Sequence, residues 1–245
     1  MYLALTTLVG LFMIIGTTLF LLTKSSKKII NFSTGLGFGI LLFLVIFELI
    51  PEVIEIFSSQ YSITKTIIYI LLLISLGIII LKVLDIFIPD HDSSDHNKKH
   101  FLHIGIVTSI AILIHNILEG IAVYSSLNTN LNFGILLCIG VGLHNIPLGM
   151  FITSSFYKAT NNVKKTSLIM LGLSLSTFVG GAIASIFDSI MVEGLTSASI
   201  LTITIGMLIY IITYELLPTV IKEKKYCGIG IAISLIVSLI VMFLE

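Results

Sequence analysis

The sequence IGIVTSIAILIHNILEGIAVYSSL, residues 104–127, is an apolar stretch with a histidine and a glutamate near its centre. It exceeds the roughly 20 residues that an α-helix needs to cross the hydrocarbon core of a membrane. Ionisable side chains are expensive at that depth and rarely lie there without a function. His115 and Glu119 are four residues apart, so both lie on one face of the helix. The stretch therefore predicts a membrane-spanning helix that presents two ligands for a divalent transition metal.

The composition of the whole chain is that of an integral membrane protein. Of the 245 residues, 56% are hydrophobic and 11% are charged, and the mean hydropathy is +1.13. A soluble domain carries about 25% charged residues. The formal net charge is zero, so the chain lacks the basic surface that nucleic acid binding requires. The first apolar stretch has no basic N-terminal region, which predicts a retained helix rather than a signal peptide.

Eight apolar stretches are long enough to cross a membrane, so we expect an all-α protein with one transmembrane domain over residues 1–245. The expected spans are 2–23, 30–56, 63–88, 104–127, 132–157, 166–190, 196–220 and 227–244. The connections after the first, third, fifth and seventh spans hold eleven lysines, whereas the other three hold only Lys65. Because lysine-rich connections stay in the cytoplasm, both termini are predicted to be extracellular.

Two short motifs recur along the chain in mirror order. FELIP (47–51) lies late in the second span and YELLP (214–218) late in the seventh. HNILEG (115–120) lies in the fourth span and HNIPLG (144–149) in the fifth. Each matched pair occupies spans that run in opposite directions. The pattern predicts a 3+2+3 arrangement, in which spans one to three and six to eight form an inverted repeat around spans four and five. Such repeats place a substrate site at their interface near the membrane midplane.

The two central motifs are expected to form one metal site. At ~1.5 Å per residue, His115 and His144 both lie about 20 Å from the turn between their spans, so they share a depth. Antiparallel packing would gather the side chains of His115, Asn116, Glu119, His144 and Asn145, with Glu48 joining from the second span. Two histidines with one or two glutamates suit Zn²⁺, with Fe²⁺, Mn²⁺ and Cd²⁺ as competitors. Each side chain also has a structural interpretation, as a hydrogen bond between helices.

A second group of histidines lies between the third and fourth spans. We expect residues 89–103 to form a cytoplasmic His/Asp-rich loop, which contains His91, His96, His100 and His103. Short tracts of this kind bind metal weakly while disordered. Glu215, toward the cytoplasmic end of the seventh span, is a further candidate on the exit path. The alternative for the histidine-rich segment is a solvated polar loop, and the alternative for Glu215 is a structural role.

These motifs resemble the ZIP (Zrt-, Irt-like) family of divalent metal transporters, and the resemblance covers the whole chain. HNxxEG in the fourth span and Glu-x-x-Pro in the second and seventh spans carry it. It implies metal uptake without an organic cofactor, and relatives suggest a homodimer in the lipid bilayer. The short chain without targeting extensions favours a plasma-membrane location. The implied transport site consists of His115, Glu119 and His144, with Glu48 at the second-span ligand position and Asn116 and Asn145 beside the metal.

The chain departs from the family pattern at two positions. Many relatives have a carboxylate in the fifth-span motif where this chain has Leu148, and a glutamate in the sixth span where it has Thr177. Both positions belong to a second, adjacent metal in two-metal relatives. The resemblance therefore implies a site for one ion in this protein.

Two other classes of protein would use the same residues. A membrane-embedded metalloenzyme would activate a metal-bound water, but the HExxH motif of intramembrane metalloproteases is absent. A metal sensor without transport activity would be supported only by the His-rich loop. The chain has no GxxxxGK[ST] motif, so ATP is not expected to drive it directly. Zinc uptake by a transporter that is not an enzyme is the favoured prediction.

Overall fold

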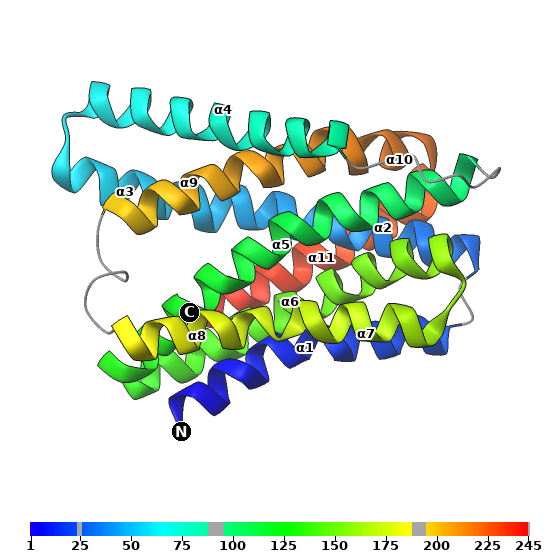
Figure 1. Ribbon diagram of the computed structural model, residues 1–245, viewed down its shortest axis with the longest axis horizontal. Helices are drawn as coiled ribbons and strands as arrows, with labels where there is room; N and C mark the ends of the chain where they lie inside the picture. The colour runs from blue at the N-terminus through cyan, green and yellow to red at the C-terminus, as the bar shows by residue number, and fades with distance from the viewer. Residues whose placement is uncertain (24–25, 88–95, 188–194, 245) are drawn as a thin grey trace.

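The computed structural model describes residues 1–23, 26–87, 96–187 and 195–244, and these ranges contain helices but no strand (Figure 1). The all-α prediction is confirmed. The helices are α1 Tyr2–Leu22, α2 Lys27–Phe43, η1 Leu44–Leu49, α3 Ile50–Gln60, α4 Ile63–Phe87, α5 His96–Thr129, α6 Leu131–Thr160, α7 Val163–Ser174, α8 Ser176–Phe187, α9 Leu195–Tyr210, η2 Ile211–Leu216, α10 Leu217–Lys222 and α11 Lys224–Leu244. Six helical segments of the described ranges are long and apolar enough to cross a membrane, consistent with a multi-pass membrane protein.

Side-chain caps define the connections next to the central helices. Asn130 caps α6, because its side-chain oxygen accepts hydrogen bonds from the backbone N–H groups of Asn132 and Phe133 at 3.2 and 3.3 Å. Asn161 ends the same helix in the left-handed region, with a φ of 48°. Asn162 then caps α7 by accepting from the Lys165 N–H at 3.0 Å. These polar residues satisfy backbone groups at the helix ends, as expected from the capping preferences of asparagine.

The α5 helix begins earlier than the sequence pattern suggested. Residues 96–103, which were expected to complete the cytoplasmic loop, instead form the first turns of this helix. Lys98, Lys99 and the histidines of this segment are compatible with a helix that extends past the apolar span. His91 and the acidic residues near it lie outside the described residues.

Two wide π-helical turns coincide with the two FELIP-like motifs. In η1 the Ile50 N–H donates to the Val45 carbonyl, five residues earlier. In η2 the Leu217 N–H donates to the Ile212 carbonyl in the same way. Each wide turn precedes a proline, Pro51 or Pro218, which has no N–H and whose ring clashes with the carbonyl four residues before it. Widening the turn relieves that clash, so both motifs have the same local structure.

The central helix α6 packs closely against α1 through glycine. A Cβ atom added at Gly149 would clash with the Met13 carbonyl oxygen, and one added at Gly16 would clash with the Ile146 carbonyl oxygen. Glycine at both positions lets the two backbones approach directly, as small residues do in membrane helix pairs.

The other central helix, α5, packs against α8 in the same way. A Cβ at Gly120 would clash with the Thr177 carbonyl oxygen, and a Cβ at Gly180 with that of Ile117. Gly120 and Gly149 end the two HNI motifs, so equivalent motif positions make equivalent contacts. This correspondence is what an inverted repeat would produce.

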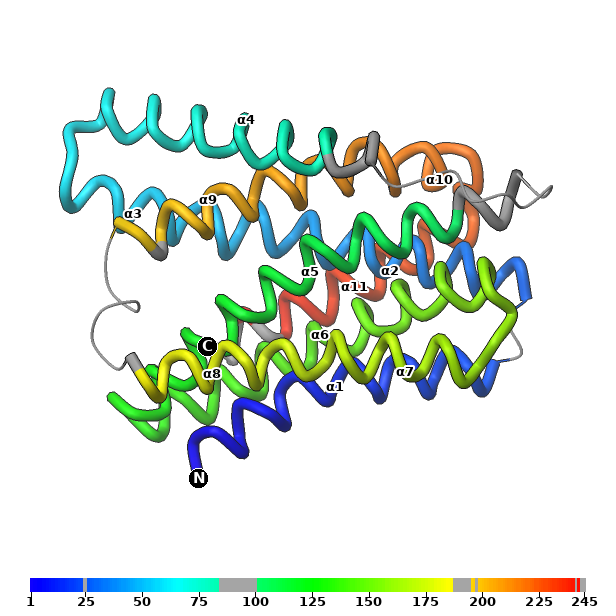
Figure 2. Tube along the Cα trace, viewed as in Figure 1, coloured from blue at the N-terminus to red at the C-terminus, as the bar shows by residue number. Residues whose placement is uncertain are grey.

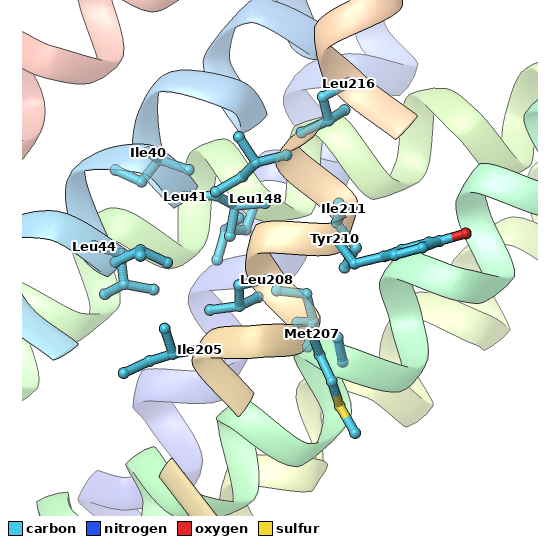
Figure 3. Close-up of a cluster of buried hydrophobic side chains, with 14 of the residues drawn as sticks. Ile40, Leu41, Leu44, Leu148, Ile205, Met207, Leu208, Tyr210, Ile211 and Leu216 are labelled. Atoms are coloured by element: carbon cyan, nitrogen blue, oxygen red, sulfur yellow. The ribbon is translucent and has the colours of Figure 1, made fainter. Parts of the chain in front are cut away.

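The helices form two sides with the central pair between them. Helix α4 runs along α9 at one edge and α1 runs along α7 and α8 at the opposite edge, with α5 between the edges (Figure 2). A buried aliphatic cluster joins α2, α6 and α9. Figure 3 shows Leu148 of α6 facing Leu41, Leu44 and Leu208 in this cluster. Because these side chains exclude water, the centre of the protein is dry on the side of Leu148.

Candidate metal centre

Three side chains from the two central motifs meet inside the helix bundle. His144 Nε2 lies 2.7 Å from Glu119 Oε1, and His115 Nε2 lies 3.2 Å from the same oxygen. One ligand atom from each residue can be chosen so that all three lie within 4.8 Å of one another. The exposed fractions of the three side chains are 4%, 5% and 8% for His115, His144 and Glu119. The structure therefore brings together the His-Glu-His set that the motif spacing suggested.

Several polar atoms of this cluster lack a protein partner. Glu119 Oε2 and His115 Nδ1 are buried and have no hydrogen-bond partner among the described residues. Buried polar atoms are normally satisfied by protein, water or a bound ion. Two imidazoles and a carboxylate at this separation form three donors of a tetrahedral zinc site and leave room for a fourth ligand. The donor set fits Zn²⁺ better than it fits Mg²⁺ or Ca²⁺, which prefer oxygen alone.

The two asparagines of the motifs point their amide nitrogens away from the cluster. Asn145 Nδ2 donates to the Val9 carbonyl of α1 at 3.4 Å, and Asn116 Nδ2 donates to the Leu173 carbonyl of α7 at 3.3 Å. Gly149 packs against Met13, and Val9 lies four residues before Met13. Gly120 packs against Thr177, and Leu173 lies four residues before Thr177. The two asparagine bonds therefore follow the same repeat. The side-chain oxygens Oδ1 of both asparagines are buried and unpaired among the described residues. Asn145 thus joins α6 to α1, whereas Asn116, whose Nδ2 also donates to Met13 Sδ at 3.4 Å, joins α5 to both α7 and α1. Each keeps one side-chain oxygen available.

A break between α7 and α8 supplies the acceptor for Asn116. The Ser174 hydroxyl donates to the Leu171 carbonyl at 2.8 Å and the Ser176 hydroxyl donates to the Leu173 carbonyl at 2.6 Å. Serine hydroxyls that bond back to the preceding turn bend helices. The Leu173 carbonyl consequently remains accessible to Asn116 from α5. The pattern Ser-Leu-Ser is the sequence signal for this break, which the apolar spacing alone did not indicate.

Glu48 lies in the wall of a cavity that leads to the cluster. The cavity has a volume of about 690 Å³, and its lining includes Glu48, Glu52 and all three residues of the cluster. On α5 the lining begins at His115 and continues toward Thr129, and on α6 it extends from Phe133 to His144. The cavity therefore opens toward the α5–α6 turn and ends at the His-Glu-His cluster. Glu48 does not belong to the group of ligand atoms within 4.8 Å, so it lies near the centre rather than in it.

The two positions that depart from the family pattern carry no charge near the cluster. Leu148 is fully buried in the aliphatic cluster. Thr177 is also fully buried, and its hydroxyl has no partner among the described residues. Neither side chain offers a carboxylate.

A second histidine–carboxylate contact lies further along α5. His103 Nε2 is 3.7 Å from Glu215 Oε1, and the two side chains are 26% and 8% exposed. His103 precedes His115 by twelve residues, which is about 18 Å along a helix. The side chains of His96 and His100 lie outside the described residues, as does His91. Two of the residues assigned to the exit path are thus in contact.

Comparison with known proteins gives the class of this protein. A sequence profile described as "ZIP Zinc transporter" matches residues 89–244. The chain belongs to this family of divalent metal transporters in membranes. It is similar to the zinc transporter ZupT of Chlorobaculum parvum, with 28% identity over 230 residues that cover 88% of this chain and 86% of the relative. ZupT of Shigella dysenteriae is 28% identical over 225 residues, 88% of this chain and 85% of the relative. ZupT of Stenotrophomonas maltophilia is 28% identical over 233 residues, 91% and 87% of the two chains.

Proposed function

We propose that this protein carries Zn²⁺ across the plasma membrane into the cytoplasm, and that His115, Glu119 and His144 bind the ion in transit. The contact of Glu119 Oε1 with both imidazoles at the closed end of a cavity carries this proposal. Imidazole and carboxylate would replace part of the water shell of the ion. Because protons compete for the same ligands, zinc affinity should fall in acid. Fe²⁺, Mn²⁺ and Cd²⁺ would compete for the same donors.

The cavity and the distribution of the lysines support the proposed direction of transport. We propose that all eight spans predicted from the sequence cross the membrane, with both termini outside and the 89–103 segment in the cytoplasm. The cavity would then open to the exterior at the α5–α6 turn. Phe57, Tyr61 and Tyr69 pack together at the α3–α4 turn, at the same end, where aromatic rings suit the membrane interface. The lysine-rich connections lie at the other end.

Release would require movement around Leu148. The cavity lining stops at the His-Glu-His cluster, and the aliphatic cluster of Figure 3 fills the space beside Leu148. Rocking of one inverted repeat against the other is a transport motion that suits this arrangement. Glu215 and His103 would receive the ion on the cytoplasmic side, followed by His91, His96 and His100.

The remaining predicted residues have supporting roles in this proposal. Glu48 would complete the coordination of the ion from the cavity wall. The Oδ1 atoms of Asn116 and Asn145, which have no partner among the described residues, would stabilise the ion or its water. Without carboxylates at Leu148 and Thr177, one ion is bound at a time. The 3+2+3 arrangement over residues 1–245 belongs to this proposal, as does a homodimer, which rests on the family resemblance alone.

Metal flux into proteoliposomes tests the function. Purified protein should show saturable uptake of Zn²⁺, and His115→Ala should abolish it while its thermal unfolding remains cooperative. Thr66→Val is the matched control, because Thr66 is buried in α4 away from the centre and valine has nearly the same shape. Parallel measurements with Fe²⁺, Mn²⁺ and Cd²⁺ rank the ions. Folded protein that binds zinc without any flux would point to a sensor instead.

A further inference from the structure

The cavity that leads to the cluster is lined by acidic side chains at more than one depth. Among the residues that the structure describes, Glu48, Glu52 and Glu119 are its carboxylates, and none of its lining residues is a lysine. A cleft of one charge sign with low-dielectric walls concentrates counter-ions and speeds their capture. The unpaired Oε2 of Glu119 at its closed end, on a side chain only 8% exposed, indicates that the ligand of this cavity is a cation.

Glu52 lies nearer the mouth of this cavity than the central cluster does. It follows Glu48 by four residues, across the junction between the wide turn η1 and α3, and both side chains line the cavity. Glu48 is half-buried whereas Glu52 is exposed. Neither carboxylate has a hydrogen-bond or ion-pair partner in the part of the chain that the structure describes. The two glutamates therefore present their oxygens to the cavity without competition from protein donors.

The chemistry of this pair differs from that of the centre. It offers carboxylate oxygens alone, without imidazole, and at least one of the two is open to water. Oxygen ligands of this kind bind hydrated divalent cations, including Mg²⁺ and Ca²⁺. Without imidazole, they attract divalent ions mainly through charge and discriminate little among them. A cation held there keeps most of its water and exchanges quickly.

We infer that Glu52, with Glu48 one turn deeper, forms an outer capture site that takes up hydrated divalent cations before they reach the His-Glu-His cluster. This inference rests on the proposed direction of transport. Glu52 raises the rate at which ions enter and leaves selection to the two histidines. Magnesium, present in excess, occupies the outer site and slows zinc capture without entering the centre.

The test compares Glu52→Gln with Glu55→Gln. Glu55 is an exposed glutamate of the same helix that does not line the cavity, so it controls for the loss of one charge. Glu52→Gln should raise the half-saturating zinc concentration for flux about threefold to tenfold at low salt and leave the maximal flux unchanged. Excess Mg²⁺ should raise the half-saturating zinc concentration of the native protein and of Glu55→Gln, but much less that of Glu52→Gln.

Stopped-flow zinc binding to detergent-solubilised protein separates this inference from the proposed function. The association rate should fall in Glu52→Gln by the same factor, with an unchanged dissociation rate, even if no flux is measured. Equal association rates in the native protein and Glu52→Gln would overturn the capture site. So would equal slowing in Glu55→Gln, or a loss of maximal flux with an unchanged half-saturating concentration.

Discussion

Glu48 and Glu215 occupy equivalent places in two wide π-helical turns, each of which ends two residues before the proline of its motif. Glu48 lines the cavity on one side of the metal centre, and Glu215 contacts His103 on the other. The repeated motif therefore places one carboxylate on each side of the centre. On the transport path proposed above, an ion would meet both.

The metal centre should bind one zinc ion tightly per protomer. Isothermal titration of purified protein with Zn²⁺ measures this directly. Loss of groups that only orient a metal ligand weakens binding about 10–100-fold, so Glu119→Ala, which removes a ligand, should weaken it by more than about 100-fold. Ions at the histidine-rich segment should bind more weakly. Two equally tight sites that survive mutation of residues 91–103 would contradict a single-ion centre.

Gly149 should tolerate no side chain. Its contact with the Met13 carbonyl leaves no space, so Gly149→Ala must separate α6 from α1 and should lower the free energy of unfolding by about 1–3 kcal/mol. Gly172→Ala is the control, because nothing lies within 4 Å of a Cβ at that position in α7. That variant should gain about 0.5–1 kcal/mol from helix propensity. Thermal unfolding in detergent compares the two, and equal effects would argue against the close packing.

The histidine-rich segment should tune transport rather than support it. Replacing His91, His96 and His100 together with alanine removes three imidazoles of this segment and leaves His115, Glu119 and His144 unchanged. Zinc flux should persist with an altered response to cytoplasmic zinc, measured in proteoliposomes preloaded with a zinc indicator. Complete loss of flux would make the segment part of the transport path itself.

The pair Lys27–Glu223 should give a small acid-sensitive stabilisation. Lys27 Nζ lies 2.7 Å from Glu223 Oε1, and this ion pair holds the pKa of Glu223 below its ordinary value of 4.5. A carboxyl group with a lowered pKa in the folded protein stabilises it above the ordinary pKa, and this contribution disappears as the pH falls through the lowered value. Lys27→Ala should thus lower the unfolding temperature at neutral pH.

The difference between Lys27→Ala and the native protein should vanish in acid below the lowered pKa. Lys165→Ala, an exposed lysine at the start of α7, is the control and should show no such pH dependence. A Lys27→Ala difference that is constant with pH would mean that the side chain stabilises by packing alone.

Sequence alone could predict the helical segments and the meeting of the two histidines with Glu119. Apolar length defines the segments, and distance from the α5–α6 turn defines the depth of each motif. The lengthening of α5 toward His96 was not predicted, because polar residues that extend a helix beyond the apolar span have no hydropathy signal.

The local geometry of the site could not be predicted from the sequence. Proline in FELIP and YELLP predicts a disturbed helix, but a kink and a wide turn have the same sequence pattern. The direction of the Asn116 amide depends on the carbonyl that the α7–α8 break leaves accessible, which lies on a distant part of the chain. The sequence does not single out Glu52, because only the cavity shows that its side chain lines the approach to the cluster.

The wide turns have a mechanical consequence. A π-helical turn holds about one residue more than an α-helical turn. Such a turn can move along the helix one residue at a time, as one backbone hydrogen bond breaks and the next one forms. Each residue it passes changes its angular position by about 100°, the rotation per residue of an α-helix, while the helix as a whole neither slides nor melts. Pro51 and Pro218, which have no backbone N–H to donate, would limit such a movement at one end. A glutamate beside such a defect can turn toward or away from the ion path through a local rearrangement of its own helix.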